Sequence, residues 1–321
     1  MKRSSGSGTL FVLIPALVPV LSACTSVRDA EPAADATGTS VQAINNGDLD
    51  LANRFPGVGF VGRLNANGGI VAGCTGTLVT PRHVLTAAHC AIGNETANFV
   101  FVPSIYAWNP ASGIVPGATT YTHTFRREAN NRVLVPGYFA REGITTVDSD
   151  FSASSSRTAR DVALFDLDTP IVPATIPFHP ISGVAGNAAC SWDEDGTGTN
   201  VGYGATVESP LQNVADNRGN RSYAVSEDWR DSTEGGCSDD CAARYINDFH
   251  PAGSRIGETN GGDSGGPLFS GDLSGGASYP PTVCGVDSSS NVQPYPVDIF
   301  VPFRYGCGSI AAREIDVLSG G

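Results

Sequence analysis

The apolar segments of this chain are short, and Gly, Pro, Asn and Asp interrupt them at regular intervals. The 321 residues include 39 glycines and 21 prolines, and sustained 3.6-residue periodicity is nearly absent. Because such turn residues separate the short strands of antiparallel sheets, the pattern predicts an all-β fold. After removal of a leader, the length suffices for one large or two small barrels with a core.

The apolar runs also predict where the strands lie. We expect strands at 58–64, 70–79, 83–86, 98–102, 132–135, 162–167, 201–206, 283–287 and 299–303. Residues 310–318 are an exception with helical periodicity, which predicts a short C-terminal helix.

Charge limits the partners that this chain can have. The formal net charge is −13, and Lys2 is the only lysine in the sequence. Phosphate binding requires clustered basic residues, so the composition argues against nucleic acid as a partner. The scattered arginines form no basic tract that could hold a membrane surface.

A glycine-rich segment at residues 261–267, with the sequence GGDSGGP, surrounds Ser264. A catalytic serine needs a base, donors for the oxyanion it creates and a backbone that exposes it. Glycines on both sides allow a sharp turn and let a substrate carbonyl approach backbone N–H groups without meeting a Cβ atom. The segment therefore predicts a nucleophile loop; the alternative is a surface turn.

Two further segments favour the nucleophile loop. Residues 85–90 (LTAAHC) end in His89 and a cysteine, and residues 160–165 (RDVALF) place Asp161 at the head of an apolar strand. In the chain order His, Asp, Ser, the three motifs resemble those of the trypsin/chymotrypsin-like serine peptidases. One such motif could arise by chance, but three in the family's order indicate the family.

The resemblance covers about residues 44–318 and implies two packed six-stranded antiparallel β-barrels. The first barrel would span about 44–175 and the second about 176–321, with a C-terminal helix packed on the second. It also implies a serine endopeptidase that acts on protein or peptide substrates in the cleft between the barrels. This chemistry needs no cofactor.

The resemblance assigns a role to each residue of the motifs. Ser264 would be the nucleophile, His89 the general base and then acid, and Asp161 the carboxylate that orients the imidazole and stabilises its cation. The backbone N–H groups of Gly262 and Ser264 would form the oxyanion hole.

A second resemblance concerns activation. Ile44, followed closely by a glycine, is similar to the family's mature N-terminus, and Asp263 matches the aspartate that pairs with the new amine. Cleavage after Ala43 would then convert a zymogen into the active form. Because Ala43 is not basic, a different protease would have to make this cut. The alternative is that Ile44 begins an edge strand.

The N-terminus predicts export. Lys2 and Arg3 precede an apolar run at 10–21, which is too short and too rich in proline for a comfortable membrane span. The run ends in the sequence LSAC, which looks like a bacterial lipobox with Cys24 as the lipidated residue. An ordinary signal peptide is the alternative. We expect a signal at 1–23, a tether or propeptide at 24–43, and an outer-membrane, cell-surface or secreted protein whose membrane contact is a lipid anchor.

Eight cysteines in an exported chain suggest disulfide bonds. The resemblance implies a bridge between Cys74 and Cys90, beside the catalytic histidine. Cys237 and Cys241 could close a small loop, whereas the pairing of Cys190, Cys284 and Cys307 stays open. Zinc at 237–241 and calcium at the acidic segment 193–196 are weaker alternatives, because neither segment has a full ligand set.

Substrate selection would depend on two segments near Ser264. Ungapped counting places Glu258, with Thr259 beside it, at the bottom of the family's specificity pocket. Ser288 and Ser289 fall where the family has an aromatic residue and a glycine, and Asp287 adds a second carboxylate. These positions favour cleavage after Arg or Lys.

Two other functions are open alternatives. The chain could be a catalytically silent trypsin-like surface binding module, although such proteins usually lose a triad residue. It could also be a serine esterase, since residues 262–266 have the spacing Gly-x-Ser-x-Gly. In the α/β-hydrolases, however, the histidine follows the serine, whereas His89 precedes Ser264.

Overall fold

The computed structural model describes residues 44, 47–90, 98–109, 111–124, 161–184, 190, 196–204, 219–232, 245–249, 259, 262–275, 280–291 and 297–302. The predicted leader with Cys24, the strand at 132–135 and the C-terminal helix lie outside these ranges, as does Glu258. In the described residues, no helix has the length and apolar character needed to cross a membrane.

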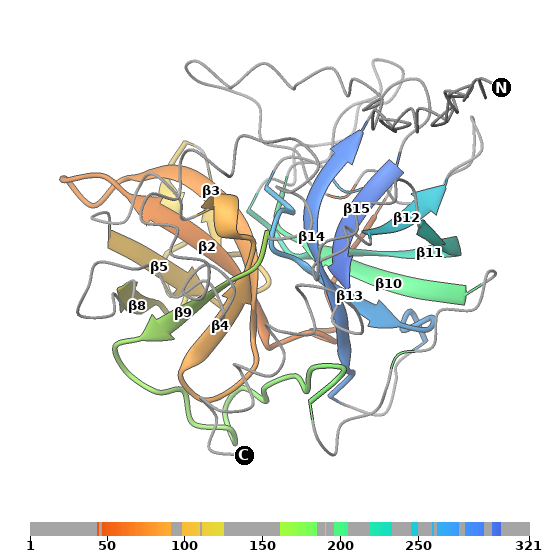
Figure 1. Cartoon of the computed structure of the whole chain (residues 1–321). Helices are drawn as coiled ribbons and strands as arrows, with labels where there is room; N and C mark the ends of the chain where they lie inside the picture. Colours follow the sequence, from red (N-terminus) through yellow and green to blue (C-terminus); the bar gives the residue numbers. More distant parts are fainter. Residues whose placement is uncertain are drawn as a thin grey trace, which may run out of the picture.

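Six antiparallel strands close the first barrel, in the order β2-β3-β4-β9-β8-β5 (Figure 1). They are β2 (Val58–Leu64), β3 (Ile70–Leu78), β4 (His83–Thr86), β5 (Asn98–Val102), β8 (Tyr121–Thr124) and β9 (Ala163–Leu167). Glycines within these strands make room for aromatic rings, since a Cβ atom on Gly59 would lie 2.4 Å from the Phe101 ring. A fully buried cluster that includes Phe99, Phe101 and Phe165 fills the barrel.

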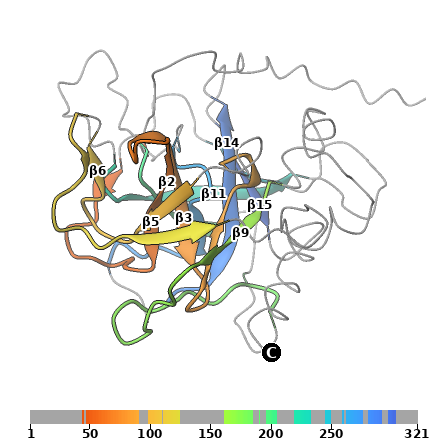
Figure 2. The ribbon, with the colours of Figure 1, turned by 90° about the vertical axis from the view of Figure 1, so that its left-hand side faces the viewer.

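The second barrel has the same number of strands. They are β10 (Gly196–Gly202), β11 (Ser222–Ser232), β12 (Tyr245–Phe249), β13 (Pro267–Ser270), β14 (Val283–Asn291) and β15 (Val297–Pro302). Because β11 pairs with both β10 and β12, the pairings close a ring. The short strand β1 (Asp48–Leu49) adds to the outside of the ring at β11. Seen from the side of the first barrel, β2, β3, β5 and β9 lie in front of β11, β14 and β15 (Figure 2).

These strands confirm the predicted all-β class. Strands at 58–64, 83–86 and 98–102 have the predicted bounds, whereas the strand expected at 201–206 lies earlier, at Gly196–Gly202. We did not expect β8, β11, β12 or β13. The segment 107–115 adds a small hairpin of β6 (Trp108–Asn109) and β7 (Gly113–Ile114).

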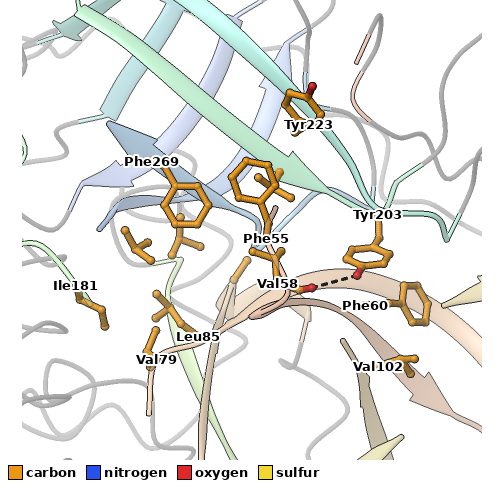
Figure 3. Packing of buried hydrophobic residues seen from close by; sticks show 14 of the residues in the cluster. Phe55, Val58, Phe60, Val79, Leu85, Val102, Ile181, Tyr203, Tyr223 and Phe269 are labelled. Carbon is orange, nitrogen blue, oxygen red and sulfur yellow. Dashed lines mark hydrogen bonds between the residues drawn. The ribbon is translucent and has the colours of Figure 1, made fainter. Parts of the chain in front are cut away.

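An aromatic cluster packs the two barrels against each other (Figure 3). The rings of Phe55 and Phe269 are stacked with centroids 5.6 Å apart. The Tyr203 hydroxyl, at the end of β10, donates to the Val58 carbonyl oxygen of β2 at 3.0 Å. Large buried side chains thus hold the barrels in one arrangement, which fixes how residues from the two halves meet.

A buried ion pair joins the N-terminal segment to both barrels. The Arg221 Nε atom donates to Asp50 Oδ2 at 2.9 Å, and neither side chain has exposed area. Arg221 Nη1 also donates to the Val58 carbonyl oxygen at 3.0 Å. The other Asp50 oxygen accepts the backbone N–H of Arg54 at 2.8 Å. Sequence patterns did not reveal this pair.

Candidate active site

Asp161 holds His89 by two hydrogen bonds. Its Oδ1 atom accepts the backbone N–H of His89 at 2.8 Å, and its Oδ2 atom accepts Nδ1–H of the imidazole at 2.6 Å. The carboxylate is 1% exposed and the imidazole 24% exposed. His89 lies in the single turn η1 (Ala88–Cys90) after β4, and Asp161 lies two residues before the start of β9. Because β4 and β9 are neighbours in the barrel, strand pairing brings the two residues together.

A third side chain contacts the same carboxylate. The Ser288 hydroxyl, from β14 of the second barrel, donates to Asp161 Oδ2 at 2.6 Å. Sequence counting places Ser288 at the specificity pocket, whereas the structure places its hydroxyl on Asp161. Counting residues along the sequence from Gly285 could not show where β14 contacts the first barrel. It also could not show the register shift that β14 has between Asp287 and Ser289.

The backbone around Ser264 depends on glycine. Gly262 and Gly265 have φ angles of +103° and +86°, which L residues with a Cβ atom rarely adopt. The Gly266 N–H donates to the Asp263 carbonyl oxygen at 2.7 Å and closes the turn. Ser264 is partly exposed at this turn. The backbone therefore makes the sharp turn that the flanking glycines predicted.

Close contacts dock the Ser264 turn on the first barrel beside His89. The Thr75 N–H donates to the Ser264 carbonyl oxygen at 2.9 Å. A Cβ atom on Gly265 would lie 2.7 Å from the backbone nitrogen of Ala87, two residues before His89. The Cys90 sulfur, next to His89, lies 3.7 Å from the Ser264 carbonyl oxygen. The three residues predicted for the triad are thus brought to one place from the two barrels.

Thr75 also ties the loop to the start of the second barrel. Its hydroxyl donates to the Gly262 carbonyl oxygen at 2.9 Å and accepts the Tyr203 N–H at 3.0 Å. This threonine is fully buried. Sequence analysis did not single it out, since a threonine within an apolar strand gives no local signal.

The Asp263 side chain packs against the end of β10, at Gly202 and Gly204. It is buried, and Oδ1 accepts the Gly204 N–H at 2.9 Å. A Cβ atom on Gly202 would lie only 1.8 Å from that oxygen, so the glycine is required for the carboxylate to sit there. Ile44 is fully buried, and its carbonyl oxygen accepts the Gly47 N–H at 3.2 Å. The predicted pairing of the Ile44 amine with Asp263 requires a cut chain and stays a prediction.

The family model described as Trypsin matches residues 44–305. This chain belongs to the trypsin family. No curated protein matches the sequence significantly.

Solved structures of this family have a similar fold. One is a thermostable serine protease, AL20, from an extremophilic microorganism; it is 19% identical, has a TM-score of 0.50, and the match covers 83% of this chain and 98% of that one. Another is the inactivated protease paralogue S-D1 of the scabies mite, which is 15% identical with a TM-score of 0.51 and coverage of 86% and 98%. At these identities the likeness establishes the fold alone.

Two disulfide bonds lie in the part of the chain that the structure describes. Cys74 and Cys90 are bonded, which confirms that prediction. Cys190 and Cys284, whose pairing the sequence left open, form a second bond. Cys237, Cys241 and Cys307 lie outside the described ranges, as do the zinc segment and most of the calcium segment.

One set of possible metal ligands occurs in the part of this trypsin-family chain that the structure describes. It consists of Cys74, His89 and Cys90, whose ligand atoms all lie within 4.8 Å of one another. Both sulfurs of that group are in the disulfide, so no thiolate is available to a metal.

The structure describes Thr259, Ser288 and Ser289 among the residues predicted for specificity. Thr259 is buried, and its hydroxyl donates to Asp287 Oδ1 at 3.4 Å. The backbone of Ser289 lies in β14 opposite Ile299 of β15. Thr259, the neighbour of the predicted pocket-floor position, therefore contacts the strand that carries Ser288 and Ser289.

Proposed function

We propose that this trypsin-family chain is an active serine endopeptidase with Ser264, His89 and Asp161 as its triad. The observation that carries the proposal is the pair of hydrogen bonds from His89 to the buried Asp161 carboxylate. These bonds set the orientation of the imidazole and leave its other nitrogen, Nε2, to act as base. The turn that presents Ser264 packs against the backbone of Ala87 in the first barrel, and Ala87 is two residues before His89.

In the proposed reaction, the Ser264 hydroxyl oxygen attacks the scissile carbonyl carbon while His89 Nε2 takes the proton. The oxyanion accepts hydrogen bonds from the N–H groups of Gly262 and Ser264, each worth about 2.7–4 kcal/mol in the transition state. The C–N bond then breaks, and His89 returns the proton to the leaving amine. In the second half, His89 takes a proton from water, and the water oxygen attacks the carbonyl carbon of the acyl-enzyme. The bond to Ser264 then breaks, and His89 returns the proton to the serine oxygen. Throughout, Asp161 stabilises the imidazolium cation.

We further propose that the chain is made as a zymogen. Cleavage after Ala43 would free the Ile44 amine to pair with Asp263, the residue that precedes Ser264. The burial of both Ile44 and Asp263 supports this arrangement, because an amine and a carboxylate that pair away from water attract each other more strongly than they do in water. In the same proposal, an activating protease makes the cut, the mature enzyme favours Arg or Lys, and Cys24 carries a lipid anchor on an exported protein.

A fluorophosphonate probe tests the activity and the switch together. The purified chain without its leader is treated before and after limited proteolysis, and the labelled residue and the new N-terminus are mapped. We expect label on Ser264 once Ile44 is exposed, and none in the Ser264→Ala variant. Label on the uncut chain would contradict the zymogen. Absence of label in both states would contradict the enzyme and favour the silent binding module.

A further inference from the structure

Thr75 of β3 holds two carbonyl groups of the Ser264 loop (residues 262–267), one on each side of Asp263. Its hydroxyl donates to the Gly262 carbonyl oxygen at 2.9 Å. Its backbone N–H donates to the Ser264 carbonyl oxygen, also at 2.9 Å. Thr75 is fully buried, so water does not compete for these bonds. One residue of the first barrel therefore holds two peptide groups of a loop that belongs to the second.

The hydrogen of the Thr75 hydroxyl has a fixed direction. The same oxygen accepts the Tyr203 N–H at 3.0 Å, and a backbone N–H can only donate, so this contact uses a lone pair of the oxygen. The hydroxyl hydrogen is then left for the Gly262 carbonyl oxygen, which can only accept. The hydroxyl therefore connects the end of β10 to the loop with every donor and acceptor role determined.

The backbone that carries this hydroxyl is also held. Thr75 pairs with Phe60 of β2 inside the closed first barrel. The Thr86 hydroxyl of β4 donates to the Thr75 carbonyl oxygen at 2.7 Å, and Thr86 is fully buried. Two neighbouring strands thus fix the position from which the Thr75 side chain reaches the loop.

The held carbonyl groups alternate along the chain with the two proposed oxyanion donors. The Ser264 N–H belongs to the peptide unit between the two carbonyls that Thr75 holds. The Gly262 N–H belongs to the unit directly before them. A peptide unit is planar, so a hydrogen bond to its carbonyl orients the whole unit.

Gly262 is the point at which this orientation needs support. Its φ is +103°, and a residue without a Cβ atom can adopt several other backbone conformations at little cost. The peptide unit between Gly262 and Asp263 joins the two donors, so a rotation of this unit would turn them away from each other. The bond from the Thr75 hydroxyl opposes that rotation.

We propose that Thr75 is a positioning residue for the oxyanion hole, whose hydroxyl keeps the N–H groups of Gly262 and Ser264 aimed at one oxygen atom. The inference rests on the proposed peptidase function and deepens it, because it names a group outside the loop that sets the geometry of the donors. Such donors stabilise a transition state because they are oriented before the reaction begins. Thr75 itself does not contact the substrate in this role.

Thr75→Val tests the hydroxyl, because valine has nearly the shape of threonine but no oxygen. We expect kcat on a peptide substrate to fall by about 10-fold to 100-fold and KM to stay within about twofold, since the donors act in the transition state. Thr75→Ser keeps the hydroxyl and should restore kcat to within about threefold of wild type.

Thr77→Val is the matched control from the same strand. Thr77 is fully buried like Thr75, but its hydroxyl has no hydrogen-bond partner among the described residues. The same substitution there removes an oxygen that holds nothing, so kcat should equal that of wild type. A similar loss in both variants would show that any buried threonine of β3 affects the rate, which would overturn the specific role of Thr75.

A peptide aldehyde measures the oxyanion hole more directly than a rate does. The Ser264 oxygen bonds to the aldehyde carbon while His89 takes the proton, and the former carbonyl oxygen then accepts from the oxyanion donors. The peptide alcohol of the same sequence cannot form this bond and is the reference. With a sequence that wild type cleaves, Thr75→Val should bind the aldehyde about 10-fold more weakly or worse, and the alcohol within about twofold of wild type.

The possible failures are distinguishable. Equal aldehyde affinity in wild type and Thr75→Val would overturn the role of Thr75, while the peptidase stands. A wild type that cleaves no peptide and takes up no fluorophosphonate would overturn the peptidase and this inference with it. If Thr75→Val does not fold, Thr75→Ala removes the same oxygen and adds no atom, and the same comparison decides. If both variants fail to fold while Thr75→Ser folds, the hydroxyl supports the fold alone and the inference is wrong.

Discussion

Asp161 receives hydrogen bonds from both barrels, since His89 belongs to the first and Ser288 to the second. Both bonds reach the same oxygen, at 2.6 Å each. The orientation of the carboxylate therefore depends on how the barrels are docked as well as on its own strand. Ser288 is accordingly a positioning residue that acts through Asp161.

Ser288→Ala removes one donor from this buried carboxylate. A hydrogen bond to a charged group is worth about 1.5–3 kcal/mol, so we expect kcat to fall by about 10-fold to 100-fold. Because Ser288 acts through orientation, KM should change little, and Ser288→Thr should restore most of the rate. Steady-state kinetics on one peptide substrate decide this. An unchanged kcat would show that Asp161 needs no second donor.

Gly202→Ala tests whether activity depends on the position of the Asp263 carboxylate. The new methyl group would lie 1.8 Å from Asp263 Oδ1, so the carboxylate must move. Since Asp263 sits between Gly262 and Ser264, the oxyanion donors should shift with it, and kcat/KM should fall by about 100-fold or more. Gly275→Ala is the matched control, because no atom lies within 4 Å of its Cβ position. Equal activity in the two variants would contradict this account.

Local motifs predicted His89, Asp161 and Ser264, because each lies in a short segment whose composition reflects its own chemistry. The Cys74–Cys90 bond followed from the resemblance for the same reason. Ser288 could not be placed in this way. Its partner lies 127 residues away, and nothing local distinguishes a serine that contacts a carboxylate from one that faces solvent.

Among the elements, the connector between β9 of the first barrel and β10 of the second contains His179, which forms hydrogen bonds to both barrels. The His179 N–H donates to the Leu78 carbonyl oxygen of β3 at 2.8 Å. Its Nδ1–H donates to the Pro281 carbonyl oxygen, before β14, at 3.1 Å. The imidazole is fully buried, with its centroid 4.9 Å from that of the Phe269 ring. His179 therefore has a structural position that no sequence motif indicated.

Burial lowers the pKa of His179 from its ordinary value of 6.5 to about 4, and the Arg221 charge adds to this effect. Above pH 6.5 both folded and unfolded states hold a neutral imidazole. As the pH falls from 6.5 toward 4, the unfolded state takes up a proton that the folded state excludes. We therefore expect the free energy of unfolding to fall over this window, by about 3 kcal/mol in full.

Urea denaturation at pH 7.5 and pH 4.5 measures this loss. His179→Asn can still donate to Pro281 but does not titrate, so it serves as the reference for all other groups. Between the two pH values, the stability of wild type relative to this variant should fall by about 2–3 kcal/mol. A constant difference would show that His179 does not contribute.

Strands were predictable where apolar residues form a compact run, as at 58–64 and 98–102. The long strand β11, Ser222–Ser232, carries Ser, Glu, Asp and Arg, so its composition resembles a loop. Such a strand is specified by pairing with β10 and β12 and not by its own side chains. Strand pairing of this kind leaves no trace in a single sequence.

For the whole molecule, the Asp50–Arg221 pair connects the N-terminal segment to the barrels. Removal of one partner leaves the other charge buried, which costs about 3–5 kcal/mol. We expect a loss of that size for Asp50→Asn and for Arg221→Met. The double variant should lose less than the sum, because it leaves no buried charge. Urea unfolding of wild type, the two single variants and the double variant gives this double-mutant cycle. Losses of stability that simply add would contradict a direct pairing of the two side chains.

The pairing of β1 with β11 sets the order of events in folding. Asp48 lies opposite Tyr223, and Arg221 follows Asp50 by 171 residues, so these contacts close a very long loop. The strands β2 to β4, by contrast, pair with near neighbours and can form while the chain is still short. Contacts of high sequence separation form slowly because the loop entropy is lost first. The buried position of Ile44 therefore becomes available only after the second half of the chain has folded, and the N-terminal segment is among the last parts to reach its place.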